Sequence, residues 1–179
     1  VIIEQEPPIS PIGVAPTLRS HRVGLGLYDL TDAGLIRREF IAVDVTGAHT
    51  EIAELVGKQQ PDLLLVNDGD LTFAKVRLDK KSWKTATAQL GAISDSLARA
   101  VIWSAAWDMT RDAEVSTGEF LDLVLAGIDR ETDVGVTSGV LRQLSMAIDQ
   151  FAAPEHRDAY RLRVAQACEG LAAQADPGS

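Results

Sequence analysis

The stretch NDGDLTFAKVRLD, residues 67–79, marks the point at which the pattern of the sequence changes. An Asn-Asp-Gly cluster between two apolar runs is typical of a turn. The alternation that follows it is typical of a β-strand. We therefore predict a hairpin turn at 67–70 and a last strand at 73–78. One side of that strand carries Phe73, Lys75 and Arg77, and the other carries Ala74, Val76 and Leu78.

Short strands are also predicted before this stretch. Breaks rich in Gly, Pro and Asp separate them, and this spacing suggests a small antiparallel β-sandwich. The proline-rich residues 7–16 are expected to form a loop. The expected strands cover 1–5, 21–30, 35–45 and 61–68, with 51–56 either a weak strand or a helical turn. Val23, Leu25 and Leu27 should face one way, and Ile36, Phe40 and Ala42 should lie opposite Arg37, Glu39 and Ile41.

After Asp79 the apolar period changes from two residues to 3.6, which predicts helices. The candidate N-caps are Asp79, either Ser94 or Asp95, and Asp133. Ser116 with Glu119 fits a capping box. Pro154 suits the first turn of a last helix. Five helices are expected, starting near 80, 96, 117, 134 and 154.

The predicted fold class is therefore α+β, a small antiparallel β-sandwich followed by an irregular helical array. We expect a sandwich domain at 1–79 and the first helices of an α-helical domain at 80–179. Similar helices with short connections favour an array over a closed bundle.

Composition narrows the possible functions. The chain has 17 basic and 26 acidic residues, a formal net charge of −9, so we expect no binding to nucleic acid. The apolar runs are too short to span a bilayer, and no signal peptide is recognisable, so we expect no membrane partner. The lone Cys168 fits a reducing, cytoplasmic setting and is interpreted as a small buried apolar residue.

Candidate metal sites are incomplete. Asn67, Asp68 and Asp70 resemble the start of a calcium loop, but Leu78 stands where a bidentate Glu is needed. His21, His49 and His156 lie far apart in the sequence, and the zinc pattern HExxH is absent. We therefore expect no metal-binding residues in this chain.

Other candidate sites also favour structural interpretations. Gly24 and Gly26 form a G-x-G without a third glycine, which favours close strand packing over dinucleotide binding. No G-x-S-x-G elbow is present, so we expect no catalytic residue. Trp103 and Trp107 are expected to pack in the core. Arg99, Asp108 and Arg111 are expected to form charge pairs. Lys80, Lys81 and Lys84 are expected to lie on a solvated helix face.

Four segments carry a resemblance to the aminopeptidase N family. PDLLLVNDGDLTFAKVRLD (61–79) resembles the end of that family's β-sandwich domain. LARAVIWSAAWDMTRDAEVSTGEFLDLVLAGI (97–128) resembles the first helices of its C-terminal domain, with W-x-x-x-W-D-M similar to the actinobacterial branch. HRVGLGLYD (21–29) and LIRREFIAVDV (35–45) resemble preceding sandwich strands.

The resemblance implies a piece of a zinc metallo-aminopeptidase, which removes N-terminal residues from peptides. The family's HExxH and G-x-M-E-N motifs are absent, so no catalytic, cofactor-binding or metal residue carries over, and the chain alone should be inactive. Zinc would belong to the parent enzyme, and the first sandwich strand would be missing. The implied partners are the catalytic domain of the same parent chain and, in the full enzyme, peptide substrates. The implied role is to brace that domain and to shape or cap the active-site chamber.

Two alternatives stay open. The chain could be a free-standing interaction scaffold without enzymatic activity, which predicts polar ends on the helical array. It could also be a metal-dependent enzyme that uses Asp68 and Asp70. In that case Asp70→Asn should abolish metal binding, and calorimetry without metal heat would exclude the idea.

Overall fold

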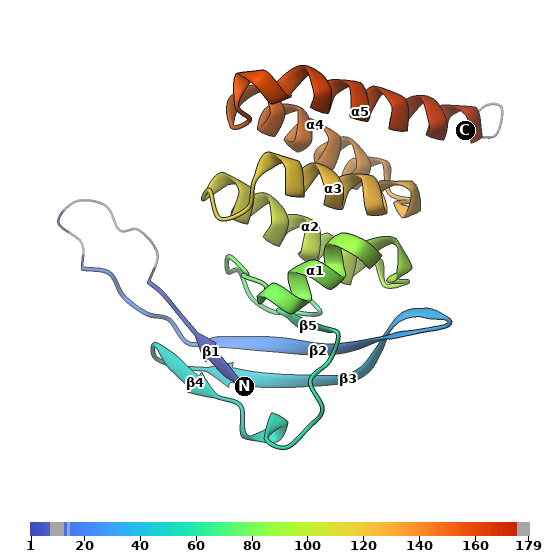
Figure 1. Ribbon diagram of the computed structural model, residues 1–179. Coiled ribbons are helices and arrows are strands. Elements are labelled where there is room, and N and C mark those ends of the chain that lie inside the picture. The colour runs from blue at the N-terminus through green and yellow to red at the C-terminus, as the bar shows by residue number, and fades with distance from the viewer. Residues whose placement is uncertain (8–12, 14, 175–179) are drawn as a thin grey trace.

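Two antiparallel sheets form the first part of the fold in the computed structural model, which describes residues 1–7, 13 and 15–174 (Figure 1). One sheet pairs β1 (Ile2–Glu4) with β4 (His49–Glu51). The other has the order β3–β2–β5, formed by Gly34–Val45, His21–Thr31 and Leu63–Val66. The short helix η1 (Ala53–Leu55) follows β4, so residues 51–56 form mainly a helical turn. Most of the expected loop at 7–16 lies outside the described residues.

A small apolar core confirms the predicted face of β2. Val23, Leu25 and Leu27 are buried there against side chains of β3 and of the segment around η1. Successive residues of a strand point to opposite faces, so this alternation directs all three into one core. The other buried members of this core are Val43, Val45, Ile52 and Leu55.

A β-bulge between Leu27 and Tyr28 shifts the register of β2 against β3. Arg37 therefore pairs with Tyr28 and Phe40 pairs with Gly26, which places Arg37 and Phe40 on the same face. The Arg37 guanidinium lies 5.5 Å from the centroid of the Phe40 ring. The prediction that these two residues lie on opposite faces was wrong, because an extra residue in one strand reverses the alternation beyond it.

The segment after β5 corrects a second prediction. Asn67–Asp70 does form a turn, closed by a 2.9 Å bond from the Asp70 N–H to the Asn67 carbonyl. Residues 73–78, however, pair with no strand among the described residues, so the predicted last strand and hairpin are absent from this part of the chain. The predicted alternation of side chains is nevertheless present from Lys75 to Leu78, whereas Ala74, predicted on the side of Val76, is exposed. Val76 and Leu78 are buried, whereas Phe73 is fully exposed.

Five helices follow and stack in chain order away from the sheet (Figure 1). With the antiparallel sheets, they confirm the α+β class. Short helical turns, η2 (Leu90–Ala92) and η3 (Ile128–Arg130), extend the first and third helices. The five are α1 (Lys80–Gln89), α2 (Ser96–Arg111), α3 (Thr117–Gly127), α4 (Val134–Gln150) and α5 (Pro154–Gln174).

The helix starts agree with the caps expected from sequence. Asp79 and Asp95 each accept two backbone N–H bonds, and Asp133 accepts one from Val136. Asp95, rather than Ser94, caps α2. Ser116 and Glu119 form the reciprocal capping box at α3. Such caps satisfy backbone donors that have no partner inside the helix.

Loss of the Ser116 cap should measurably weaken the fold. Ser116→Ala removes the acceptor of the 3.2 Å bond from the Glu119 N–H and one half of the capping box. We expect the free energy of unfolding to fall by about 1 kcal/mol. Urea unfolding followed by circular dichroism would measure this change. Ser138→Ala, an exposed site inside α4, is the matched control and should leave stability nearly unchanged.

The main core joins sheet and helices. Tyr28, Leu63 and Leu65 from the sheet belong to the same buried cluster as side chains of α1, α2, α3 and α4. The helices therefore rest on the sheet through continuous apolar packing, with α1 directly over β5. A domain boundary near residue 79 stays a prediction.

The last helix differs from the other four. None of its residues is fully buried, although Tyr160, Val164 and Leu171 pack against the main core. Cys168 is exposed, so its interpretation as a buried residue was wrong. The error arose because small apolar neighbours also occur on the outer face of a terminal helix.

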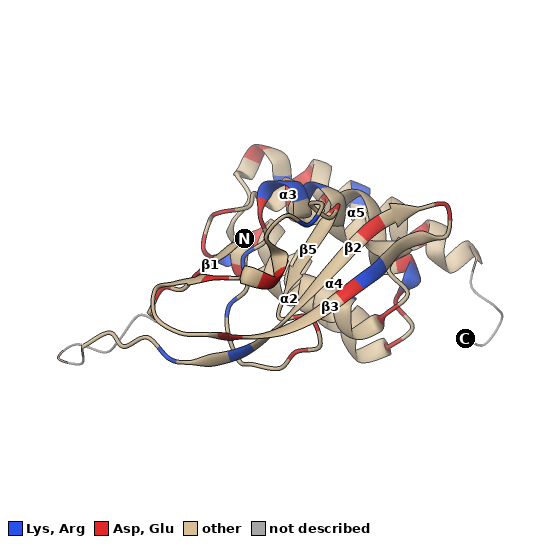
Figure 2. Cartoon of the chain, turned by 90° about the horizontal axis from the view of Figure 1, so that it is seen from below, with Lys and Arg blue, Asp and Glu red and all other residues tan. Residues whose placement is uncertain are grey.

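Charged residues of both signs share the surface. Figure 2 shows Lys and Arg interspersed with Asp and Glu along the sheet and the helix ends. Among the described residues, no helix combines the length and the apolar character needed to cross a membrane.

Candidate functional site

A buried carboxylate lies where the turn after β5 meets strand β2. Asp68 is completely buried. A Cβ atom on Gly24 would overlap the backbone oxygen of Asp68, and one on Gly26 would overlap its carboxylate. The two glycines thus allow the turn to pack directly on the strand. This geometry accounts for the G-x-G by close strand packing, as expected.

Two side chains bind the Asp68 carboxylate, and a third contacts one of them. Asp68 Oδ2 accepts a 3.1 Å bond from the Tyr28 hydroxyl and a 3.0 Å bond from Arg37 Nη1. Arg37 also lies 3.8 Å from the carboxylate of Asp95, the N-cap of α2. Oδ1 has no partner among the described residues. This Asp68 cluster (Tyr28, Arg37, Asp68 and Asp95) therefore links β2, β3, the turn and α2.

The Asp68 cluster shifts the ionisation of its members. Burial first, and then the Asp68 charge, raise the pKa of the Tyr28 phenol well above its ordinary value. The hydrogen bond to Asp68 raises the pKa of Arg37. Arg37 is thus held as a cation beside the buried carboxylate, which reduces the cost of burying that charge.

The raised pKa of Tyr28 predicts a loss of stability at high pH. Above about pH 10 the unfolded chain releases the phenolic proton while the folded chain keeps it, so the unfolded state binds fewer protons and stability falls as pH rises. The contribution of this residue should approach about 1.4 kcal/mol per pH unit. Urea unfolding at several alkaline pH values would measure the slope, which should be smaller in Tyr28→Phe. Equal slopes in the two proteins would contradict the prediction.

The candidate metal residues are not brought together. The Asp68 charge is already balanced by Arg37, and Asp70 is exposed with its Oδ1 bound by the Asn67 amide at 3.2 Å. His21, His49 and His156 lie on β2, β4 and α5. No group of three or more His, Cys, Asp or Glu residues suited to a metal ion occurs in 1–7, 13 and 15–174. The donor set therefore does not fit zinc.

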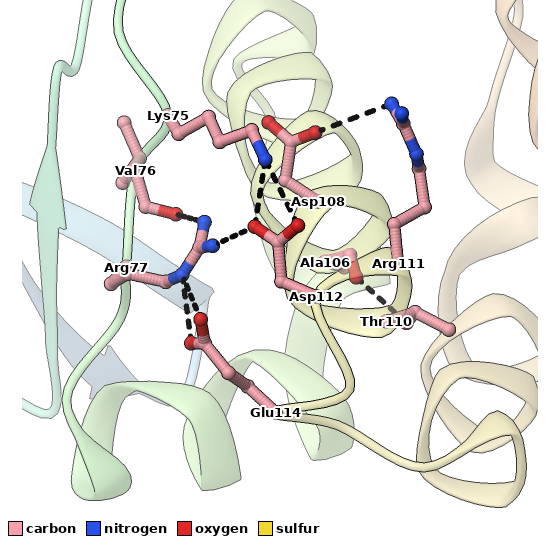
Figure 3. A network of polar contacts seen from close by, with 9 residues as sticks. All are labelled: Lys75, Val76, Arg77, Ala106, Asp108, Thr110, Arg111, Asp112 and Glu114. Atoms are coloured by element: carbon pink, nitrogen blue, oxygen red, sulfur yellow. Dashed lines mark hydrogen bonds and ion pairs between the residues drawn. The ribbon is translucent and has the colours of Figure 1, made fainter. Parts of the chain in front are cut away.

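An ionic network ties the segment after the turn to the end of α2 (Figure 3). Lys75 Nζ lies 2.7 Å from Asp112 Oδ2, and Arg77 Nε lies 2.7 Å from Glu114 Oε2. Arg77 also pairs with Asp112. The pKa of Asp112 is lowered, chiefly by the hydrogen bond from Lys75. With the contact between Arg37 and Asp95, α2 is linked to the preceding part of the chain at both ends.

A second buried ion pair lies between the helices. Arg99 Nε donates to Glu131 Oε1 at 2.6 Å, and Trp103 Nε1 donates to the same oxygen at 3.0 Å. Trp107 packs near Phe120 and Phe151. The two tryptophans thus pack among the helices, and Arg99 forms a buried charge pair, both as expected. Arg111 lies 4.0 Å from Asp108, and Lys81 reaches Asp62 at 3.1 Å.

One cavity of about 370 Å³ lies between the α2–α3 loop and the corner joining α4 to α5. His156 and Tyr160 contribute polar groups, but the lining contains no charged Asp, Glu, Lys or Arg. The cavity lining therefore supplies no carboxylate to orient the histidine. The full lining is Thr110, Ala113, Val115, Ser116, Thr117, Gly118, Phe151, Ala152, Ala153, His156 and Tyr160.

Comparison with known sequences bears on this arrangement. The sequence model of the ERAP1-like C-terminal domain family matches residues 63–178. The chain belongs to this family. The match begins at β5, so the family segment includes the turn, the ionic network and all five helices.

A curated relative extends the likeness to the rest of the chain. Aminopeptidase N of Streptomyces lividans is 48% identical over 180 residues, which is 99% of this chain. The chain spans 21% of the length of that relative. The resemblance to part of an aminopeptidase N is thereby confirmed.

Sequence reasoning missed the Asp68 cluster and Glu131. The G-x-G of Gly24 and Gly26 and the polar turn at 67–70 are both visible in the sequence, but only the fold shows that they are in contact. Glu131 had no local signal, because its partners Arg99 and Trp103 lie 32 and 28 residues away.

Proposed function

We propose that this chain is a non-catalytic portion of a zinc-dependent aminopeptidase that removes N-terminal residues from peptides. The observation that carries the proposal is the 48% identity over 99% of the chain to about a fifth of aminopeptidase N from Streptomyces lividans. Zinc would be bound by the parent protein outside these residues, because the His, Cys, Asp and Glu side chains of the described residues form no group suited to a metal ion.

The proposed role is to brace the catalytic domain of the same parent chain and to help shape or cap the chamber over its active site. Apolar packing between sheet and helices and the ionic links at both ends of α2 support a rigid role. A rigid wall beside an active site controls access and excludes water. We also propose a cytoplasmic location, as the lone cysteine suggests.

The first test is the mass of the native polypeptide. An antibody against residues 1–179 should detect, in source-cell lysate, a band several times heavier than 19.2 kDa. The immunoprecipitated protein should release chromophore from aminoacyl substrates, and a chelator should stop the release. A native band at 19.2 kDa, or a heavy protein without this activity, would contradict the proposal.

A free-standing interaction scaffold is the second candidate. The observation that favours it is the outer helix α5, which buries no residue fully and exposes charged side chains such as Asp158, Arg161 and Arg163. Terminal units of helical arrays need such a polar outer surface. A native band at 19.2 kDa would support this candidate.

A further inference from the structure

Residues 73–78 form no helix or strand and pair with no strand among the described residues, although Val76 and Leu78 are buried while Lys75 is exposed and Arg77 half-buried. None of the six main-chain N–H groups donates to an acceptor among the described residues. The preceding residue is different, because the Asn67 side chain accepts from the Thr72 N–H at 3.1 Å and donates to the Thr72 carbonyl at 2.8 Å. The Val76 carbonyl accepts a 3.3 Å bond from Arg77 Nη1, but the unused N–H groups leave the segment able to serve as a template for a strand.

This segment is held in place rather than left loose. Thr72 Oγ1 lies 2.7 Å from His21 Nδ1 at its start. Val76 and Leu78 are buried in the main core, and Lys75 and Arg77 are paired with the end of α2 (Figure 3). A fixed backbone loses little conformational entropy when a partner strand binds, which favours pairing.

Two exposed apolar side chains lie at and just before the start of this segment. Phe73 is fully exposed, and Leu71, two residues earlier in the sequence, is about half exposed. Removing apolar surface from water stabilises an association, so a strand that covered Phe73 would gain apolar burial as well as backbone bonds.

We propose that residues 73–78 accept a β-strand from a part of the parent polypeptide outside residues 1–179. This inference rests on the proposed function. The relative supports it, since the remaining four fifths of its length lies outside the matched part. A second copy of this chain is the less favourable donor, because each copy carries a net charge of −9 and like charges repel.

Hydrogen exchange in the full-length native polypeptide tests the pairing. If a strand binds there, amides of 73–78 should exchange at least roughly tenfold more slowly than those of Gln59 and Gln60, in an exposed loop of this chain. Exchange as fast as in that loop, in a long polypeptide with chelator-sensitive activity, would overturn the pairing and leave the proposed function standing. Protection that appears only at high protein concentration would identify a second copy as donor and would also overturn the inference.

A substitution tests the contact with Phe73 in the same full-length polypeptide. Phe73→Ser should lower the melting temperature by several degrees and speed exchange of the neighbouring amides. Val134→Ser, at an exposed apolar site at the start of α4, is the matched control and should change neither. Equal effects of the two substitutions would contradict burial of Phe73. A native polypeptide of 19.2 kDa would overturn the proposed function and this inference together.

Discussion

Glu131→Ala is expected to lower the free energy of unfolding by about 3–5 kcal/mol. The Glu131 and Arg99 side chains are only 2% and 6% exposed. Removal of the carboxylate leaves the Arg99 charge buried, with carbonyl contacts such as the 2.7 Å bond to Ile93 but no counter-ion. It also leaves the Trp103 N–H without its acceptor. Urea unfolding monitored by tryptophan fluorescence would measure the loss.

Asp129→Ala is the matched control for this substitution. Asp129 also pairs with an arginine, but the pair with Arg130 is 3.5 Å long and largely exposed. Exposed pairs contribute between about 0 and 1 kcal/mol, so this variant should differ little from the unmodified protein. Equal losses in the two variants would show that burial of Glu131 is not the source of its effect.

Gly24→Ala is expected to cost about 3 kcal/mol, the upper part of the range for an overpacked core. The new methyl would overlap the backbone oxygen of Asp68 and lie 2.7 Å from a ring carbon of Phe40. A backbone atom cannot move aside as a flexible side chain can. We therefore expect the turn at 67–70 to be displaced from β2, and with it the hydrogen bonds between Asp68, Tyr28 and Arg37.

Thermal unfolding and near-ultraviolet circular dichroism would detect both effects. The control is Gly139→Ala inside α4, where a methyl meets nothing within 4 Å. Alanine is the better helix former, so this change should stabilise by about 0.5–1 kcal/mol. If Gly24→Ala were as harmless as the control, close packing of the turn on β2 would not be the reason for the glycine.

The helical part of the fold was predictable because its boundaries are set locally. Asp79 and the Ser116–Glu119 pair act on backbone groups within three residues, so the sequence contains both partners. The faces of β2 were predictable for the same reason, since alternation is a property of neighbouring residues. The β-strand character of residues 1–66 was predictable from turn residues and two-residue alternation, although these signals do not show which strands pair.

Interactions between distant segments were not predictable from these patterns. The bond between Arg37 and Asp68 spans 31 residues, and it depends on the bulge that reverses the face of Arg37. The alternation was present over 75–78, but alternation cannot show whether a partner strand is within reach. Cys168 was misjudged because its neighbours in sequence do not reveal which face of α5 meets the core.

The order of the helices also has an evolutionary consequence. Because α1 to α5 stack in sequence, their connections emerge at two opposite edges of the array (Figure 1). An insertion or deletion in one connection changes an edge and leaves the stacked apolar layers in register. The two edges can therefore diverge between homologues at different rates, and new specificity can arise on one of them while the other is conserved.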